Sequence, residues 1–184
     1  ALNIRSLITG IKLKFPLLQI LVIDDGSSDG TAEIVNELIV SESKIALLSR
    51  AEKSGLGNAY RAGFAWGMSK DFQYFIEMDA DHSHRVEDLE KLLEVADKYD
   101  LTIGSRWIKG GQIIGWAKHR EILSRFGSGY SRILLGLNVR DCTSGFRVFS
   151  RRALESIDLE NLESNGYGFQ VETLYRAHQA GLKV

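Results

Sequence analysis

Two acidic residues one position apart follow a short apolar segment near the middle of the chain. Asp79 and Asp81 enclose Ala80 directly after residues 74–78. Carboxylates spaced in this way can share Mg²⁺ or Mn²⁺, directly or through water, and such ions usually also bind substrate phosphates. The ion could then neutralise charge that develops on a leaving diphosphate. The alternative is structural, with both acids capping a helix that begins near Val86.

A second acidic pair ends an earlier apolar segment, residues 19–24. Asp24 and Asp25 come just before Gly26, which opens a turn rich in serine, aspartate and glycine. An acid at a strand end, followed by a tight turn into a helix, can hold a ribose or a base by hydrogen bonds. Ordinary loop and helix-cap chemistry is the alternative for this pair.

An arginine follows a third apolar segment, residues 101–104. Arg106 stands in Gly-Ser-Arg, and a guanidinium at a strand end can grip a diphosphate through two parallel hydrogen bonds. The alternative is an ion pair with an acid of a nearby helix. Together with a metal and a ribose holder, this arginine would complete a site for a nucleotide diphosphate.

Arginines recur through the second half of the chain, at positions 106, 120, 125, 132, 140 and 147. Arg120 and Ser124 are four residues apart, so one face of a helix could present both to a single phosphate. Solvated helix charges are the alternative, especially for Arg125 and Arg132.

Other reactive side chains carry weaker signals. His82 and His84 flank the acidic pair, and we expect both to be exposed loop residues, with contact to a metal or sugar as the alternative. Cys142 is the single cysteine, so a disulfide within the chain is impossible and a zinc cluster is not expected. It is predicted to be a small packing residue.

The elements that must position these residues alternate between strand and helix. Short apolar segments predict buried strands, and 3.6-residue periodicity predicts the helices between them. Small residues in the helix that follows Gly55 indicate close packing on a sheet. Such alternation predicts an α/β fold with a mostly parallel sheet and helices on both faces. The carboxyl ends of parallel strands share one edge, where ligands of such sheets bind.

Composition limits the classes of function. The 184 residues fit one domain, and the formal net charge of −1 argues against a nucleic-acid binder that works by bulk charge. The apolar runs are too short to span a bilayer, which, with the single cysteine, favours a cytoplasmic protein. Residues 122–137 are amphipathic. They could approach a membrane surface with their apolar side, or pack that side on the sheet.

The chain resembles family 2 glycosyltransferases with the GT-A fold, and most closely the polyprenyl (dolichyl) phosphate mannosyltransferases. The segments that carry the resemblance are LVIDDGSSDGTAEIV, KSGLGNAYRAGF, YFIEMDADHSH, DLTIGSRWIKGG, HREILSRFGSGYSRILLG and RDCTSGFRVF. The resemblance implies metal-dependent transfer of mannose from GDP-mannose to a polyprenyl phosphate, with inversion. It also implies a peripheral location at the cytoplasmic face of a membrane.

The resemblance implies a role for each matching residue. The metal would be held by Asp79, Asp81 and Ser83, and the nucleotide by Asp24, Asp25, Gly26, Lys53, Asp79 and Ala80. Catalysis would depend on Asp79, Asp81, Arg106 and Arg120. The acceptor phosphate would be held by Arg120, Ser124, Ser144 and Arg147, beside a loop that contains Asp141 and Gly145. Such an acceptor is largely dianionic at neutral pH and needs no strong base. By analogy with other family members Glu172 could act as a base, but we expect a role on a helix surface.

One expected element of this family has no match in the sequence. Relatives begin with a strand and a PTYNE-like segment, whereas residues 1–5 match the part of the family pattern just after that segment. We therefore expect residues 1–184 to form a single catalytic domain, truncated at both ends, without the first strand. A gap between neighbouring strands and weaker nucleotide binding should result.

Two other functions stay open at this stage. The first is a family 2 transferase with another donor, such as UDP-glucose, or with a hydroxyl acceptor. No QxxRW motif of the processive polysaccharide synthases is visible, which counts against that branch. The second is a non-catalytic nucleotide-binding module.

Overall fold

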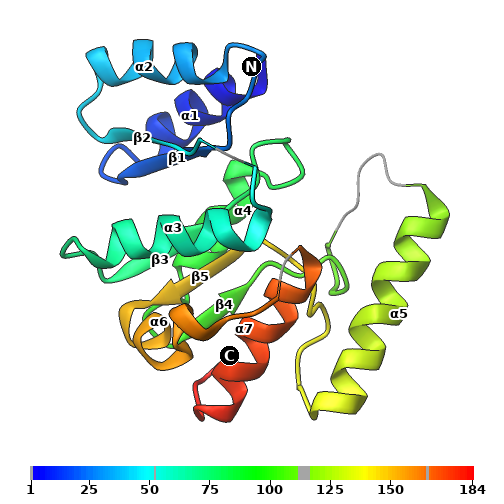
Figure 1. Ribbon diagram of the computed structural model, residues 1–184. Helices are drawn as coiled ribbons and strands as arrows, with labels where there is room; N and C mark the ends of the chain where they lie inside the picture. The colour runs from blue at the N-terminus through cyan, green and yellow to red at the C-terminus, as the bar shows by residue number, and fades with distance from the viewer. Residues whose placement is uncertain (1, 52, 112–116, 165) are drawn as a thin grey trace.

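The structure is a computed structural model that describes residues 2–51, 53–111, 117–164 and 166–184. Helices and strands alternate along the chain as predicted up to β4 (Figure 1). The elements are α1 (Leu2–Lys14), β1 (Ile20–Asp24), α2 (Thr31–Ser41), β2 (Ile45–Ser49), α3 (Leu56–Met68), β3 (Tyr74–Glu77), α4 (Val86–Leu93), β4 (Leu101–Ile103), α5 (Lys118–Leu135), β5 (Arg147–Ser150), α6 (Arg151–Ile157), a 3₁₀ turn (Leu159–Asn161) and α7 (Tyr167–Gln179).

The strands form two sheets. β1 and β2 pair in parallel, with Asp24 opposite Ser49. β5 lies between β3 and β4 and runs antiparallel to both, so β3 and β4 point the same way. The α/β architecture is confirmed, but β5 was not predicted. It is only four residues long and begins with a charged residue, so it lacks the apolar run by which the other strands were recognised.

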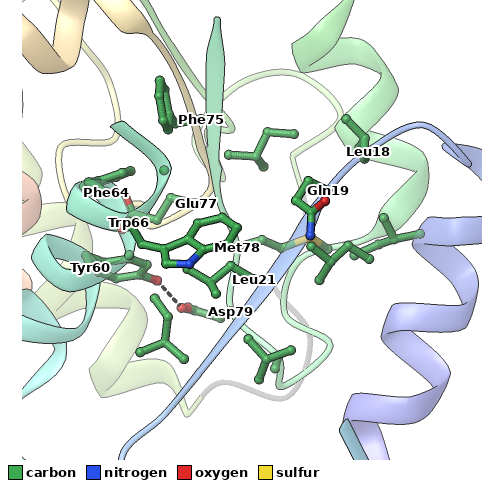
Figure 2. A pocket seen from close by; sticks show the side chains of 18 of the residues that line it. Leu18, Gln19, Leu21, Tyr60, Phe64, Trp66, Phe75, Glu77, Met78 and Asp79 are labelled. Atoms are coloured by element: carbon green, nitrogen blue, oxygen red, sulfur yellow. Dashed lines mark hydrogen bonds between the residues drawn. The ribbon is translucent and has the colours of Figure 1, made fainter. Parts of the chain in front are cut away.

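A cavity of about 480 Å³ separates the two sheets. Its lining comes from α1, β1, α3 and β3 and is largely apolar, with Leu21, Phe64, Trp66 and Phe75 among the side chains that face it (Figure 2). Within the described ranges, β1 pairs only with β2 and β3 only with β5. Each strand therefore has an unpaired edge toward the cavity, and the predicted gap between neighbouring strands is confirmed.

Helix α3 bridges the gap and packs on both sheets. A Cβ atom on Gly63 would lie 2.5 Å from Ile23 of β1, and one on Gly67 would lie 2.8 Å from the ring of Phe75 of β3. Only glycine permits such close approach. The close packing predicted from the small residues of this helix is thus confirmed at both ends of the contact.

Each of the two sheets has its own hydrophobic core. Ile4, Ile8, Val35 and Ile45 pack together beside β1 and β2. The largest buried cluster lies around β5, α6 and α7 and includes Phe149, Leu154 and Phe169. This second core includes Phe75 of β3 and Leu101 of β4, so it supports both strands.

Helix α5 stands apart from the other helices (Figure 1). Small residues such as Ser124 and Ser128 face the rest of the molecule, whereas Phe126, Ile133 and Leu134 are 71%, 88% and 64% exposed. The alternative in which the apolar side of this helix packs on the sheet is therefore wrong. The helix also begins four residues earlier than the sequence predicts, at Lys118.

Candidate active site

The acidic pair follows β3 at the mouth of the cavity. The Tyr60 hydroxyl donates to Asp79 Oδ1 at 2.8 Å, as Figure 2 shows. The Asp81 Oδ1 accepts the Ser83 amide at 2.9 Å, and both of these side chains are exposed. The Asp79 side chain remains 40% exposed, so its second oxygen can still reach a ligand. Both carboxylates of the pair thus keep exposed surface.

His84 is part of this turn and does not match its prediction as an exposed residue. Its side chain is only 13% exposed and stacks on Phe146, with ring centroids 4.8 Å apart. Its Nδ1 accepts the backbone N–H of Asp79 at 2.9 Å, and burial lowers the pKa of the imidazole. A neutral ring therefore orients the backbone of the acidic pair. His82 is exposed, as predicted, and has a positive φ of 65°.

The end of β1 lies across the cavity and carries the second acidic pair. Asp24 is buried and accepts the Ser27 amide at 3.1 Å, as the loop alternative predicts. Asp25 forms an ion pair with Arg50, at 3.2 Å, and Gly26 has a positive φ of 73°. The remaining nucleotide candidates, Lys53 and Ala80, are exposed.

The guanidinium of Arg106 binds a carboxylate of its own chain. Its Nε and Nη2 donate to the two oxygens of Asp141 at 2.8 and 2.7 Å, and Nη2 also donates to Thr143 at 2.9 Å. Asp141 has no exposed surface. This is the two-bond geometry that was predicted for a diphosphate, made here with a buried acid of the 141–145 loop. It fixes that loop against the end of β4.

The same loop holds helix α5. The hydroxyls of Ser124 and Thr143 lie 3.2 Å apart, and the Cys142 amide donates to Ser128 at 3.3 Å. Cys142 is buried, as its predicted packing role requires. The candidate Ser124 therefore lies beside the loop. The backbone of Arg120 belongs to α5, but its side chain lies outside the described residues, so its role stays a prediction.

Two predicted acceptor residues are buried beneath the loop. Arg147 has no exposed surface and donates to the carbonyls of Ser144 and Cys142 at 2.7 and 3.0 Å, and to Thr173 at 2.9 Å. The Ser144 hydroxyl donates to the Gly104 carbonyl at 2.6 Å. These side chains shape the loop: Arg147 lies in β5, between β3 and β4, and Ser144 precedes that strand. Their direct contact with an acceptor phosphate stays a prediction.

A buried acid below the metal candidates was missed. Glu77, opposite Arg147 in the sheet, is 1% exposed and accepts a hydrogen bond from Gln170. Burial raises its pKa to about 8, although the charge of Arg147 acts in the opposite direction. An acid within an otherwise apolar strand was the available sequence signal. Glu172 accepts the Glu163 and Ser164 amides, which supports the helix-surface role expected of it.

The structure brings the metal candidates close to the predicted acceptor loop. Gly145 of the loop lies against Asp79, since a Cβ atom there would be 3.8 Å from Asp79 Oδ2. The metal candidates and the acceptor loop therefore adjoin each other. The nucleotide candidates at the end of β1 lie on the far side of the cavity. Within the part of the chain that the structure describes, no cluster of three or more acidic, histidine or cysteine side chains has a metal-binding arrangement.

The family model for glycosyl transferase family 2 matches residues 2–158. The chain belongs to this family. It is a glycosyltransferase with the GT-A fold, and the matched residues include β1, β3 and the 141–145 loop. The resemblance inferred from the sequence is therefore confirmed at the level of the family.

Two curated relatives narrow the comparison. This glycosyltransferase is 43% identical over 169 residues to undecaprenyl-phosphate mannosyltransferase of Micrococcus luteus, a match that covers 92% of this chain and 70% of the relative. It is 41% identical over 184 residues to polyprenol monophosphomannose synthase of Mycolicibacterium smegmatis, covering 99% of this chain and 69% of the relative. These similarities support the mannosyltransferase subfamily.

A solved structure supports the fold. Glucosyl-3-phosphoglycerate synthase of Mycobacterium tuberculosis, in complex with Mn²⁺, UDP and glucosyl-3-phosphoglycerate, superposes with a TM-score of 0.66 at 20% identity. The match covers 96% of this chain and 61% of that protein. Of the helices described for the present glycosyltransferase, none has the length and hydrophobicity needed to cross a membrane.

Proposed function

We propose that this glycosyltransferase transfers mannose from GDP-mannose to the phosphate of a polyprenol, with inversion at the anomeric carbon. The names of two relatives at 41–43% identity support the sugar and the lipid acceptor. The observation that carries the proposal is the contact of the 141–145 loop with both Asp79 and α5. It connects the acidic pair to α5, the helix whose sequence includes Arg120 and Ser124. Residues 1–184 are proposed to act as one catalytic domain.

The acidic pair suits a divalent cation, either Mg²⁺ or Mn²⁺. Asp79 and Asp81 present oxygen ligands on an exposed turn, and oxygen is the ligand that these ions prefer. With only two carboxylates, the rest of the coordination would come from water, the diphosphate and the adjacent Ser83. The ion would supply charge neutralisation for the leaving GDP. Mn²⁺ in the solved glucosyltransferase supports the same class of ion.

The nucleoside would bind at the end of β1. Asp25 is the better candidate of the acidic pair because Asp24 already caps its own turn. Arg50, which the sequence analysis did not single out, balances the charge of Asp25 and also donates to Ser54. Lys53 and Ala80 follow β2 and β3 within a few residues, and both side chains are exposed. They complete the proposed nucleotide-binding residues.

The acceptor would be a phosphate monoester that attacks without a strong general base. Its second pKa is about 6, so it is mostly dianionic at neutral pH. The task of the protein is then to hold two anions close together, which suits Arg120 and Ser124 on α5. The guanidinium of Arg106 already donates two hydrogen bonds to Asp141. We therefore propose that Arg106 positions the loop and adds positive charge to the site, and that it does not contact the reacting groups directly.

A lipid acceptor requires contact with a membrane surface, and α5 is the proposed contact. Its apolar residues point away from the molecule, including Ile122, Phe126, Tyr130 and Ile133. Interfacial helices bury such a face in the headgroup region while their basic residues remain among the headgroups. The protein would then be peripheral at the membrane, with the acceptor phosphate beside Ser124.

A transfer assay tests the proposal. The protein is given Mg²⁺ or Mn²⁺, a short polyprenyl phosphate and a panel of labelled nucleotide sugars. Lipid-linked mannose from GDP-mannose is the expected product, and it should require the metal. Product from UDP-glucose alone would support the other-donor alternative. Transfer to free polyprenol but not to its phosphate would overturn the acceptor assignment.

A further inference from the structure

We infer that Tyr60 is a positioning residue for the metal site, which sets the orientation of the Asp79 carboxylate through its hydroxyl. The inference rests on the proposed metal role of Asp79. Tyr60 comes from α3, whereas Asp79 follows β3, so the contact joins two elements across the edge of the cavity (Figure 2). The hydroxyl donates to Oδ1 at 2.8 Å.

The Tyr60 ring packs on two other aromatic rings. It stacks on Phe169 of α7, with centroids 5.7 Å apart and planes 16° apart, and on Phe64 of α3, with centroids 6.3 Å apart. Phe64 and Phe169 both belong to the largest buried cluster. A ring fixed in this way cannot swing with the loop. The hydroxyl is thus a stationary donor, placed by the core and not by the turn that it contacts.

The hydrogen bond also makes the two Asp79 oxygens different, because Tyr60 contacts only one of them. Oδ1 is engaged by Tyr60, while the carboxylate stays 40% exposed and Oδ2 lies 4.0 Å from His84 Nε2. Since His84 fixes the Asp79 backbone by accepting its amide, backbone and carboxylate are each tied by one partner. A carboxylate oriented before the cation arrives loses less side-chain entropy on binding. Hydrogen-bonding partners of metal ligands commonly change metal affinity about 10-fold or more when removed.

The substitution Tyr60→Phe isolates this hydroxyl, because it keeps the stacked ring. We expect the Kd for Mn²⁺, measured by electron paramagnetic resonance in the presence of GDP, to rise about 10-fold. The affinity for GDP without metal and the melting temperature should change little. Tyr74→Phe is the matched control, since Tyr74 is 43% exposed on β3 and should leave the Mn²⁺ affinity unchanged.

Asp79→Asn separates this inference from the proposed function. If Asp79→Asn weakens Mn²⁺ binding while Tyr60→Phe changes the Kd by less than about twofold, the positioning role of Tyr60 is overturned and the metal role of Asp79 stands. If neither change weakens Mn²⁺ binding, both are overturned. A weakening of about 10-fold in Tyr60→Phe without loss of thermal stability supports the inference, because a purely structural role would lower stability and not metal affinity.

Discussion

The two sheets on either side of the cavity hold their functional residues in different ways. Around β3, β5 and β4, two site residues are tied by partners from other elements: Asp79 by Tyr60 of α3, and Asp141 by the guanidinium of Arg106. Asp81 is held by the Ser83 amide of its own turn. At the end of β1, Asp24 is held by its own turn and Asp25 by Arg50 after the neighbouring strand. The metal and acceptor region is therefore organised by the core, while the nucleoside region is organised locally.

This difference indicates where binding energy would have to be supplied. A site fixed by stacked rings and buried ion pairs is oriented before its ligand arrives, so less entropy is lost on binding. Both β1 and β3 have an unpaired edge at the cavity, so the two sides differ in the partners of their site residues and not in their strand pairing. We expect substitutions on the β3 side to affect catalysis and stability more strongly than equivalent substitutions on the β1 side.

The largest expected effect is on catalysis. Asp81→Ala should lower kcat/KM for mannose transfer by roughly 10³-fold, since it removes a proposed ligand of the cation that neutralises the charge developing on the leaving diphosphate. Asp25→Asn, on the β1 side, should lower it about 10-fold, mainly through a higher KM for the nucleotide sugar. Steady-state kinetics at saturating metal measures both. Equal losses in the two variants would remove the distinction between the two regions.

The next effect is on stability and compares two arginines. Arg147→Met should lower the free energy of unfolding by about 3 kcal/mol, because it leaves the buried carbonyls of Ser144 and Cys142 and the Thr173 hydroxyl without their donor. Arg50→Met should cost about 1 kcal/mol or less, since the closest atoms of its ion pair with Asp25 form no hydrogen bond. Urea denaturation followed by circular dichroism gives both values. Similar losses in the free energy of unfolding would show that the two arginines stabilise the β1 side and the β3 side equally.

A smaller effect concerns α5, which is attached to the β3 side only through its polar face. Replacing Phe126 and Leu134 by Ser should weaken binding to anionic lipid vesicles roughly 10-fold, because apolar area is no longer buried in the bilayer. Thermal stability should hardly change.

The control for this experiment is Leu13→Ser with Val40→Ser. Both residues are also highly exposed, at 82% and 91%, but lie in α1 and α2. Vesicle flotation compares the two double variants. Unchanged binding for the α5 variant, or an equal loss in both, would contradict the membrane contact of α5.

The smallest effect tests the cavity itself through two glycines of α3. A Cβ atom on Gly67 would meet the rigid ring of Phe75, whereas one on Gly63 would meet the flexible end of Ile23 beside the cavity. Both changes to Ala gain the same helix propensity. We expect Gly67→Ala to be less stable than Gly63→Ala by about 1 kcal/mol, as overpacking is costly where side chains cannot move. Thermal denaturation of both variants checks this, and the reverse order would show that the cavity gives Ile23 no room.

The sequence determined much of the fold because the relevant signals are local. Apolar segments predicted β1 to β4, small residues predicted the close packing of α3, and acidic pairs at strand ends marked Asp25, Asp79 and Asp81. The gap between the sheets was predicted from the absence of one expected segment. The strands, the packing of α3 and the acidic pairs depend on residues adjacent in the chain, so spacing and residue type were sufficient for them. The gap was implied by the family resemblance.

Only the tertiary structure decided which charged residues face a ligand. Arg106 and Arg147 are both arginines close to a strand end, yet one binds the buried Asp141 and the other supports loop carbonyls. Residues far away in sequence decide these partners and their burial, because β5 joins its sheet between two earlier strands. The same holds for α5. Its periodicity predicted an amphipathic helix, but only packing against the 141–145 loop showed that its small polar side faces inward and its apolar side faces out.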